Sequence, residues 1–231
     1  MTASLSYAVW PAVPRGTLVL VPVGSTEQHG PHLPLDTDTV VADAVARRAA
    51  REFPGALVAP ALAYGASGEH AGFPGTVSIG REALHAVLVE VARSLALWAG
   101  RVVLVNGHGG NTATVADAAR ILREEGHDLA WTGCEIPGGD AHAGRTETSL
   151  MLHLAPEHVR LDAAVAGDTR PLADLMLELV ARGVRAVSPN GVLGDPAGAS
   201  AEEGRRTLDR MTDATVHRIK AWTVDTRGRL R

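Results

Sequence analysis

Short apolar runs alternate along the chain with longer segments in which apolar residues recur every three or four positions. Runs of strand length end at glycine or at polar residues, and the longer segments have the period of an amphipathic helix. The pattern predicts strands over residues 17–23, 56–62, 101–105, 129–132 and 184–187. It predicts helices over residues 39–53, 81–98, 112–125, 146–154, 171–182 and 200–222, the last opened by a capping box at Ser200 and Glu203.

Strands separated by helices of this length are typical of βαβ units, in which the strands run parallel and helices cover both faces of the sheet. The sequence contains no internal repeat, composition shift or long linker that would divide it. We therefore expect an α/β protein with a single-domain three-layer αβα architecture and a mostly parallel central sheet, extending over residues 1–231.

Composition narrows the class of protein further. The chain has 231 residues, 45% of them hydrophobic, which supplies apolar surface for a substantial core. Its 22 basic and 26 acidic residues give a formal charge of -4, far from the basic balance of a nucleic-acid binder. No apolar run reaches the roughly 18 to 20 residues that span a bilayer, and residues 1–10 lack the pattern of a signal peptide. We expect a cytoplasmic protein that binds neither nucleic acid nor membrane.

Histidines and carboxylates gather in the turns that follow four of the predicted strands. In a parallel sheet these turns meet at one edge, which is where ligands bind. The four glycine-rich stretches are residues 24–38 (GSTEQHGPHLPLDTD), 64–76 (YGASGEHAGFPGT), 106–111 (NGHGGN) and 139–149 (GDAHAGRTETS). Imidazole and carboxylate donors suit Zn, Fe(II) or Mn, and the lone Cys134 cannot supply a thiolate cluster.

Five of these side chains match the donor count of two neighbouring ions that share a carboxylate. They are Glu27, His29, Asp38, His108 and Glu147. Each turn also has a simpler interpretation. Asp38 directly precedes the helix predicted from residue 39 and suits an N-cap, and residues 106–111 could form an anion-binding turn. His142 and Glu147 could be surface groups around a helix start.

The joint occurrence of this chemistry in four turns favours a metal site over four unrelated turns. The alternative to an enzyme is a noncatalytic module that binds an anion. Such a module would purify without stoichiometric transition metal. Cys134 has no activating partner in the sequence, so we expect a buried and inert thiol. We expect five further histidines to be solvated: His85, His127, His153, His158 and His217.

Taken together, the four stretches resemble the creatininase family of metal-dependent amidohydrolases. The resemblance extends to residues 191–200 (GVLGDPAGAS) and covers nearly the whole chain. It implies four ligands for two divalent ions, Fe(II) or Zn(II) with Mn(II) as a further candidate, and it makes Asp38 the bridge between the ions. The four ligands are Glu27, His29, Asp38 and His108.

The sequence departs from creatininase itself next to the third motif. Creatininase has Tyr and then a ligand Glu where this chain has Gly109 and Gly110, so the missing ligand is assigned to Glu147, as in relatives that share His-Gly-Gly-Asn. The acid that precedes the later motif histidine in creatininase is Ala141 here. The second difference removes a candidate proton shuttle and argues against creatinine as the substrate.

The resemblance implies hydrolysis of a C–N bond by metal-activated water in a homo-oligomer. Residues 21–39, 64–70 and 139–149 are similar to a branch of the family that cleaves a short, ribosomally made precursor peptide and releases its modified C-terminal Val-Tyr dipeptide. The alternative is a cyclic-amide or formamide hydrolase acting on a nucleotide-like or pterin-like molecule. Glu69, His70 or His142 would pass a proton to the leaving amine, and the sequence does not rank them.

Overall fold

Five parallel strands form the centre of the molecule, in the spatial order β1-β3-β2-β4-β5. The structure is a computed structural model that describes residues 3–135 and 137–231. The strands are β1 (Ala3–Ser4), β2 (Leu18–Val23), β3 (Leu57–Val58), β4 (Arg101–Asn106) and β5 (Leu129–Gly133). β2 and β4 pair along their whole length, from Leu18 opposite Arg101 to Val23 opposite Asn106, so both strands end at the same edge of the sheet.

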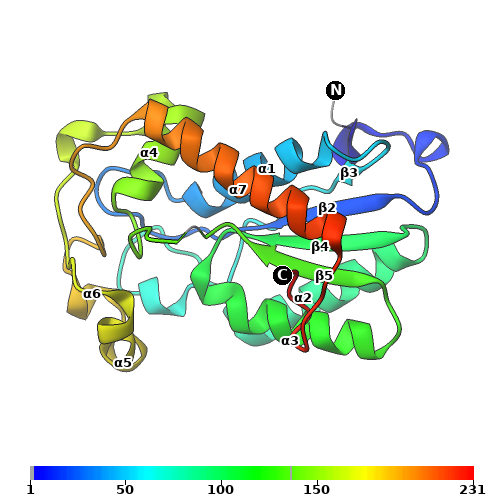
Figure 1. Cartoon of the computed structure of the whole chain (residues 1–231). Coiled ribbons are helices and arrows are strands. Elements are labelled where there is room, and N and C mark those ends of the chain that lie inside the picture. The colour runs from blue at the N-terminus through cyan, green and yellow to red at the C-terminus, as the bar shows by residue number, and fades with distance from the viewer. Residues whose placement is uncertain (1–2, 136) are drawn as a thin grey trace.

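Helices cover both faces of this sheet, which confirms the expected αβα layers (Figure 1). The helices are α1 (Thr37–Ala50), α2 (Gly80–Ala96), α3 (Thr112–Glu124), α4 (Arg145–Leu154), α5 (Leu172–Arg182), α6 (Val184–Val187) and α7 (Ala201–Ala221). Short 3-10 turns are η1 (Leu5–Tyr7), η2 (Trp10–Ala12), η3 (Gly68–His70), η4 (Gly109–Asn111), η5 (Pro156–His158) and η6 (Leu161–Ala163). Within the described residues, no helix combines the length and apolarity needed to cross a membrane.

Alternate residues of β2 belong to different cores, because successive side chains of a strand point to opposite faces. Val19, Val21 and Val23 are buried with α2 and α3, whereas Leu20 is buried with α1, α4 and α7. All four are at most 1% exposed. A central strand covered on both faces needs an unbroken apolar run, and residues 18–23 supply it.

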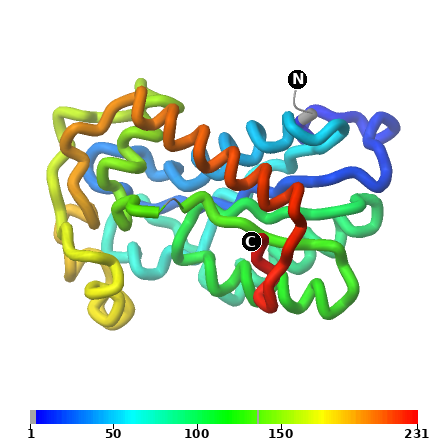
Figure 2. The backbone as a smooth tube through the Cα atoms, in the orientation of Figure 1, coloured from blue at the N-terminus to red at the C-terminus, as the bar shows by residue number. Residues whose placement is uncertain are grey.

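The chain ends beside the outermost strand. Trp131 of β5 donates its main-chain N–H to the carbonyl of Gly228 at 2.9 Å, and Leu230 donates to the carbonyl of Trp131 at 2.9 Å. Figure 2 shows this red C-terminal segment returning from α7 along the edge of the sheet. The free edge of β5 is therefore partly covered by the chain's own tail.

Two sequence predictions are wrong in type or extent. Residues 184–187, predicted as a strand, form the short helix α6, in which the N–H of Ser188 donates to the carbonyl of Val184 at 2.8 Å. A short apolar run has no decisive period, and this one packs against α5 and η3 away from any strand. The strand predicted over residues 56–62 is reduced to β3, although Ala59 and Leu62 still donate to the main-chain carbonyls of Leu20 and Pro22. β1, only two residues long, gave no sequence signal.

Helix boundaries differ in one way that matters for the site. α1 begins at Thr37 rather than at Thr39, so Asp38 lies within its first turn and is not the N-cap. The N-cap is Asp36, whose side chain makes no capping hydrogen bond. The capping box predicted for α7 is half formed: Ser200 accepts from the N–H of Glu203 at 3.2 Å, while the Glu203 carboxylate pairs with Arg145 instead.

Candidate metal centre

The turns after β2, β3 and β4 are held together by one asparagine. Asn111, at the end of the third motif, donates from its side chain to the carbonyl of Gly24 at 2.9 Å. Its side-chain oxygen accepts from the N–H of Ala66 at 2.9 Å. These bonds join three turns that are far apart in the sequence, so the predicted convergence at the carboxyl edge of the sheet is realised.

Three buried side chains form the first half-site, defined as Glu27, Asp38 and His108. His108 Nδ1 lies 3.0 Å from Asp38 Oδ2, and His108 Nε2 lies 3.1 Å from Glu27 Oε2. One donor atom from each residue lies within 4.8 Å of the others, and all three residues are at most 5% exposed. The three sequence-predicted ligands therefore share one space.

A second half-site adjoins the first and is defined as His29, Asp38 and Glu147. His29 Nε2 lies 3.2 Å from Asp38 Oδ1 and 3.9 Å from Glu147 Oε2. His29 Nδ1 donates to the main-chain carbonyl of Glu27 at 3.0 Å, which leaves the Nε2 lone pair free to face the two carboxylates. Asp38 belongs to both half-sites through different oxygens, which is the geometry of a bridging ligand.

The position of Asp38 in the first turn of α1 makes this sharing possible. Its Oδ2 accepts from the hydroxyl of Ser25 at 2.8 Å, so the carboxylate is oriented by the turn that carries Glu27 and His29. The neighbouring Thr39 donates from its hydroxyl to the carbonyl of Ser25 at 2.9 Å. Sequence reasoning passed over Ser25, although it stands inside the first motif.

The donor set fits metal ions rather than a closed network of hydrogen bonds. Glu27 is fully buried, and neither oxygen of its carboxylate has a hydrogen-bond partner within the described residues. A buried carboxylate without hydrogen bonds is costly. Burial raises the pKa of Glu27 to about 7, and burial likewise raises the pKa of Glu147 to about 7. A divalent cation would satisfy these oxygens and neutralise their charge.

The pKa values of His29 and His108 are shifted by the same carboxylates. Burial by itself would lower their pKa values, but the carboxylate of Asp38 raises the pKa of His29 to about 10, and that of Glu27 raises the pKa of His108 to about 9. Without a metal ion the carboxylates therefore retain protons on the imidazoles. Metal binding would displace those protons, because only the neutral imidazole is a ligand.

The three candidate proton-transfer residues all lie beside the first half-site. His70 Nε2 is 3.3 Å and His142 Nδ1 is 3.8 Å from Glu27 Oε1. Burial lowers the pKa of His70 to about 3 and that of His142 well below its ordinary value, so both are neutral at pH 7. Glu69 is more open: its side chain is 34% exposed, and its Oε1 lies 3.6 Å from His108 Nε2.

Glu69 occupies the space beside Gly110, which has no side chain. A Cβ atom on Gly110 would overlap the Glu69 carboxylate and the His108 ring. The space beside Gly110 is therefore filled by a side chain from η3. Two further buried residues went unnoticed in the sequence: Gln28, between the first two ligands, and His32, which bonds the hydroxyl of Thr148 at 2.9 Å beside Glu147.

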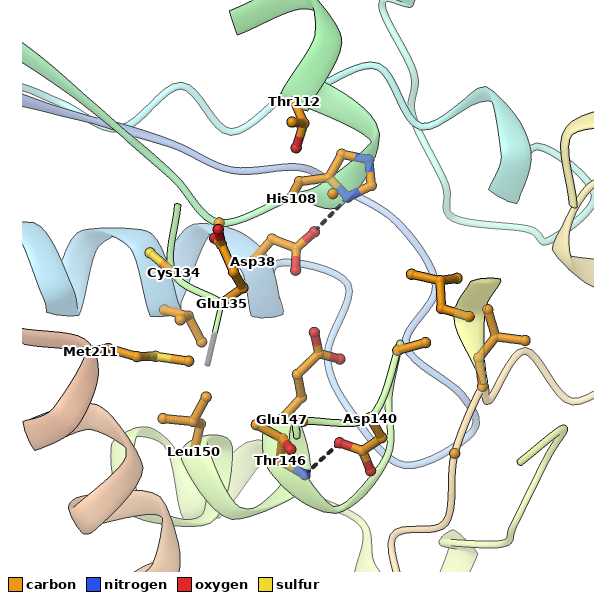
Figure 3. A pocket seen from close by; sticks show the side chains of 18 of the residues that line it. Asp38, His108, Thr112, Cys134, Glu135, Asp140, Thr146, Glu147, Leu150 and Met211 are labelled. Atoms are coloured by element: carbon orange, nitrogen blue, oxygen red, sulfur yellow. Dashed lines mark hydrogen bonds and ion pairs between the residues drawn. The ribbon is translucent and has the colours of Figure 1, made fainter. Parts of the chain in front are cut away.

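A cavity of about 540 Å³ opens onto the centre. Figure 3 shows Asp38, His108 and Glu147 converging on it from separate elements. Its wall combines apolar and polar side chains. The wall includes Cys134, Glu135, Asp140, Leu150, Arg170 and Met211.

The start of α4 positions Glu147, the candidate ligand that completes the second half-site. Asp140 accepts from the main-chain N–H of Thr146 at 2.9 Å (Figure 3). It also accepts from the main-chain N–H of Arg145. Glu147 Oε2 accepts from the N–H of Ala143 at 2.6 Å. These bonds hold the carboxylate of Glu147, 23% exposed, between His29 and the cavity.

The remaining sequence expectations concern residues outside the half-sites. Cys134 is buried, and burial raises the pKa of its thiol to about 12, as expected for an inert cysteine, although it lines the cavity. His158 and His217 are exposed as expected. The three other histidines that were expected to be solvated are partly buried and lie outside the metal-site clusters of the described chain: His85, His127 and His153.

Comparison with known proteins places this geometry in a family. The sequence profile described as creatininase, creatinine amidohydrolase, matches residues 7–219. The chain belongs to the creatininase family. It is accordingly a hydrolase of C–N bonds, and its fold and recognised motifs agree with that membership.

Individual relatives add detail. The mycofactocin precursor peptide peptidase of Mycolicibacterium smegmatis is 55% identical over 218 residues, which cover 92% of this chain and 88% of that protein. A solved structure described as creatininase Mn has a TM-score of 0.78 and 30% identity, covering 96% of this chain and 98% of that one. A mutant creatininase described as Zn-Zn type has a TM-score of 0.77 and 29% identity over 96% and 98%. Together with the two half-sites, these structures support a divalent metal in this chain.

Proposed function

We propose that the chain is a metal-dependent peptidase that cleaves the mycofactocin precursor peptide and releases its modified C-terminal Val-Tyr dipeptide. The observation that carries the proposal is the pair of half-sites sharing Asp38 at the floor of a cavity large enough for a dipeptide. The 55% identity to a protein of that name supports the substrate. The released dipeptide is the unit from which a redox cofactor matures.

In this proposal five residues hold the metal: Glu27, His29, Asp38, His108 and Glu147. Two divalent ions there would polarise the scissile carbonyl and lower the pKa of water, which is the chemistry that amide hydrolysis needs at neutral pH. Three carboxylates and two imidazoles suit Fe(II), Zn(II) or Mn(II), and the named manganese and zinc relatives support the last two.

His142 is the residue we assign to proton transfer. Its Nε2 lies 2.8 Å from the main-chain carbonyl of Gln28 and must carry the hydrogen, so Nδ1 keeps a free lone pair beside Glu27. Water adds to the scissile carbonyl carbon and gives a proton to Nδ1. The C–N bond then breaks, and the same proton passes to the leaving nitrogen. His70 offers no free lone pair, as its Nδ1 is already occupied by Gln28, and Glu69 stands as the alternative acceptor.

Mass spectrometry of the modified precursor peptide, incubated with protein loaded with zinc, iron or manganese, tests the proposal. Release of the C-terminal dipeptide is the expected result, and exhaustive chelation should stop it. Parallel incubations with a formamide and with a cyclic amide test the alternative substrate class. Turnover of those amides without peptide cleavage would remove the peptidase assignment.

Homo-oligomeric assembly is also proposed. Tyr7 and Trp10 near the N-terminus are 89% and 86% exposed, and Leu177 of α5 is 89% exposed. Large apolar side chains this exposed are typical of surfaces that a second copy covers. Light scattering of the eluting protein should give a mass that is a multiple of 24.1 kDa.

A further inference from the structure

The side-chain amide of Gln28 is held in one orientation by the backbone. Gln28 is 5% exposed. Its Oε1 accepts from the N–H of Gly30 at 2.8 Å, and its Nε2 donates to the carbonyl of Gly191 at 3.0 Å. If the amide were flipped, its NH₂ group would face the N–H of Gly30, and its oxygen would face the carbonyl of Gly191. Gly191 has a φ of +83°, and a Cβ atom there would overlap this amide, so the close approach requires glycine.

The second amide hydrogen of Gln28 determines which nitrogen of His70 carries a proton. Gln28 Nε2 lies 2.8 Å from His70 Nδ1, which must accept because Nε2 of an amide only donates. A neutral His70 therefore carries its hydrogen on Nε2. That atom lies 3.3 Å from Glu27 Oε1, so His70 presents an N–H group to the buried carboxylate.

The main-chain carbonyl of Gln28 fixes the tautomer of His142, which turns a different nitrogen toward Glu27 than His70 does. His142 Nε2 donates to the Gln28 carbonyl at 2.8 Å, which leaves its Nδ1 unprotonated, 3.8 Å from the same Glu27 Oε1. Gln28 Nε2 is also 3.0 Å from His142 Nε2. Both amide hydrogens are already used, so this contact is not a hydrogen bond. His142 thus presents a lone pair where His70 presents an N–H.

We propose that Gln28 is a positioning residue, which directs the Nε2–H of His70 toward Glu27 through its side chain and keeps Nδ1 of His142 free through its carbonyl. The inference rests on the proposed function only in giving His142 the proton-transfer role. Reversing the tautomer of His70 would put its lone pair against the Glu27 carboxylate. The resulting repulsion would displace a metal ligand without removing any donor from the site.

The test is Gln28→Glu, which keeps the shape of the side chain but replaces the donor by an acceptor. Long-range ¹H–¹⁵N spectra of the zinc-loaded protein distinguish the two tautomers of each histidine, with signals assigned through His70→Asn and His142→Asn. The wild type should show the Nε2–H form for both residues. In Gln28→Glu, His70 should change to the Nδ1–H form, while His142 should keep Nε2–H because its partner is a main-chain carbonyl.

Two further variants control for folding. Gln28→Met has no amide, so His70 should show a mixture of tautomers even if Gln28→Glu fails to fold. Thr26→Val removes a hydrogen bond to the carbonyl of Ala63 from the same turn and touches neither histidine, so both should keep the wild-type form. With zinc saturating, kcat for the precursor peptide should fall about 10- to 100-fold in the two Gln28 variants at unchanged KM.

The outcomes separate the two proposals. An Nε2–H form of His70 that persists in both Gln28 variants would overturn the role of Gln28 and leave the peptidase function standing. Tautomers of His70 and His142 that change together would also overturn it, because the two are fixed by different atoms. The tautomer measurement needs no substrate, so absence of peptide cleavage by the wild type would count against the function alone.

Discussion

The two half-sites share Asp38 but are built from different parts of the molecule. The first takes its other residues, Glu27 and His108, from turns that directly follow β2 and β4, and all three residues are buried. The second is completed by Glu147 of α4, a helix that packs on α7 outside the sheet, and this side chain faces the cavity. The sheet edge therefore builds the more buried half-site, and helix packing supplies the more exposed carboxylate of the second.

The largest expected effect comes from removing the residue that both half-sites share. Asp38→Asn replaces a bridging carboxylate by an amide that cannot neutralise two cations. We expect bound metal to fall to background and turnover to fall by more than about 10³-fold. Elemental analysis and the peptide assay measure both. Asp36→Asn, an exposed neighbour without a capping bond, is the matched control and should behave as the wild type. Two ions retained by Asp38→Asn would refute a shared ligand.

Substitution of a residue that belongs to only one half-site should release one ion and leave the other bound. His108→Ala should release the ion of the first half-site, and Glu147→Gln that of the second, so each variant should retain about one ion per chain. Turnover should fall roughly 10²- to 10³-fold in both, because each loses an electrostatic contribution to the transition state. Metal titration followed by calorimetry counts the remaining sites. Loss of both ions from either single variant would mean that the half-sites do not bind independently.

The pH dependence of the metal-free protein tests the charges in both half-sites. Burial acts to lower the histidine pKa values, but Asp38 and Glu27 outweigh it and raise those of His29 and His108 to about 10 and about 9, from 6.5. Between pH 6.5 and about 9 the folded chain therefore binds more protons than the unfolded chain. Stability that is fully present below pH 6.5 is lost as the pH rises through the folded pKa values.

This loss corresponds to at least about 2 kcal/mol, so the melting temperature in EDTA should be roughly 4 to 8 °C lower at pH 9 than at pH 7. Zinc should remove or reverse the difference, because metal binding needs the deprotonated imidazoles. Calorimetric scans at both pH values, with and without zinc, measure it. A metal-free melting temperature that rises from pH 7 to pH 9 would contradict the raised pKa values of His29 and His108.

The smallest effect is expected in the cavity wall beside both half-sites. Cys134 is buried and its pKa is raised to about 12, so it is neither a ligand nor a nucleophile at neutral pH. Cys134→Ser should change turnover by less than about threefold, equivalent to roughly 0.5 kcal/mol. It should leave the metal content unchanged. Rapid reaction of native Cys134 with a thiol reagent at pH 7, with loss of bound metal, would contradict this assignment.

Much of the architecture could be predicted because its signals are local. The strand at residues 18–23 is marked by an unbroken apolar run, and the helix at residues 201–221 is preceded by a capping serine. Neither signal depends on distant contacts. The short run at residues 184–187 could not be assigned, because a strand needs a neighbouring strand that the sequence does not reveal. The start of α1 was misplaced by two residues, so the prediction left Asp38 outside the helix whose first turn holds it.

The sequence by itself determined which donors meet, because parallel strands that end in His and carboxylate motifs bring them to one edge. Only the tertiary structure decided how these donors are used. It placed Asp38 inside a helical turn with an oxygen facing each half-site, and it placed Gln28 against His70 and Gly191. The nitrogen that carries a proton depends on partners more than forty residues away in the chain. Such partners leave no local sequence pattern, because a hydrogen bond depends on distance in space and not on spacing in the sequence.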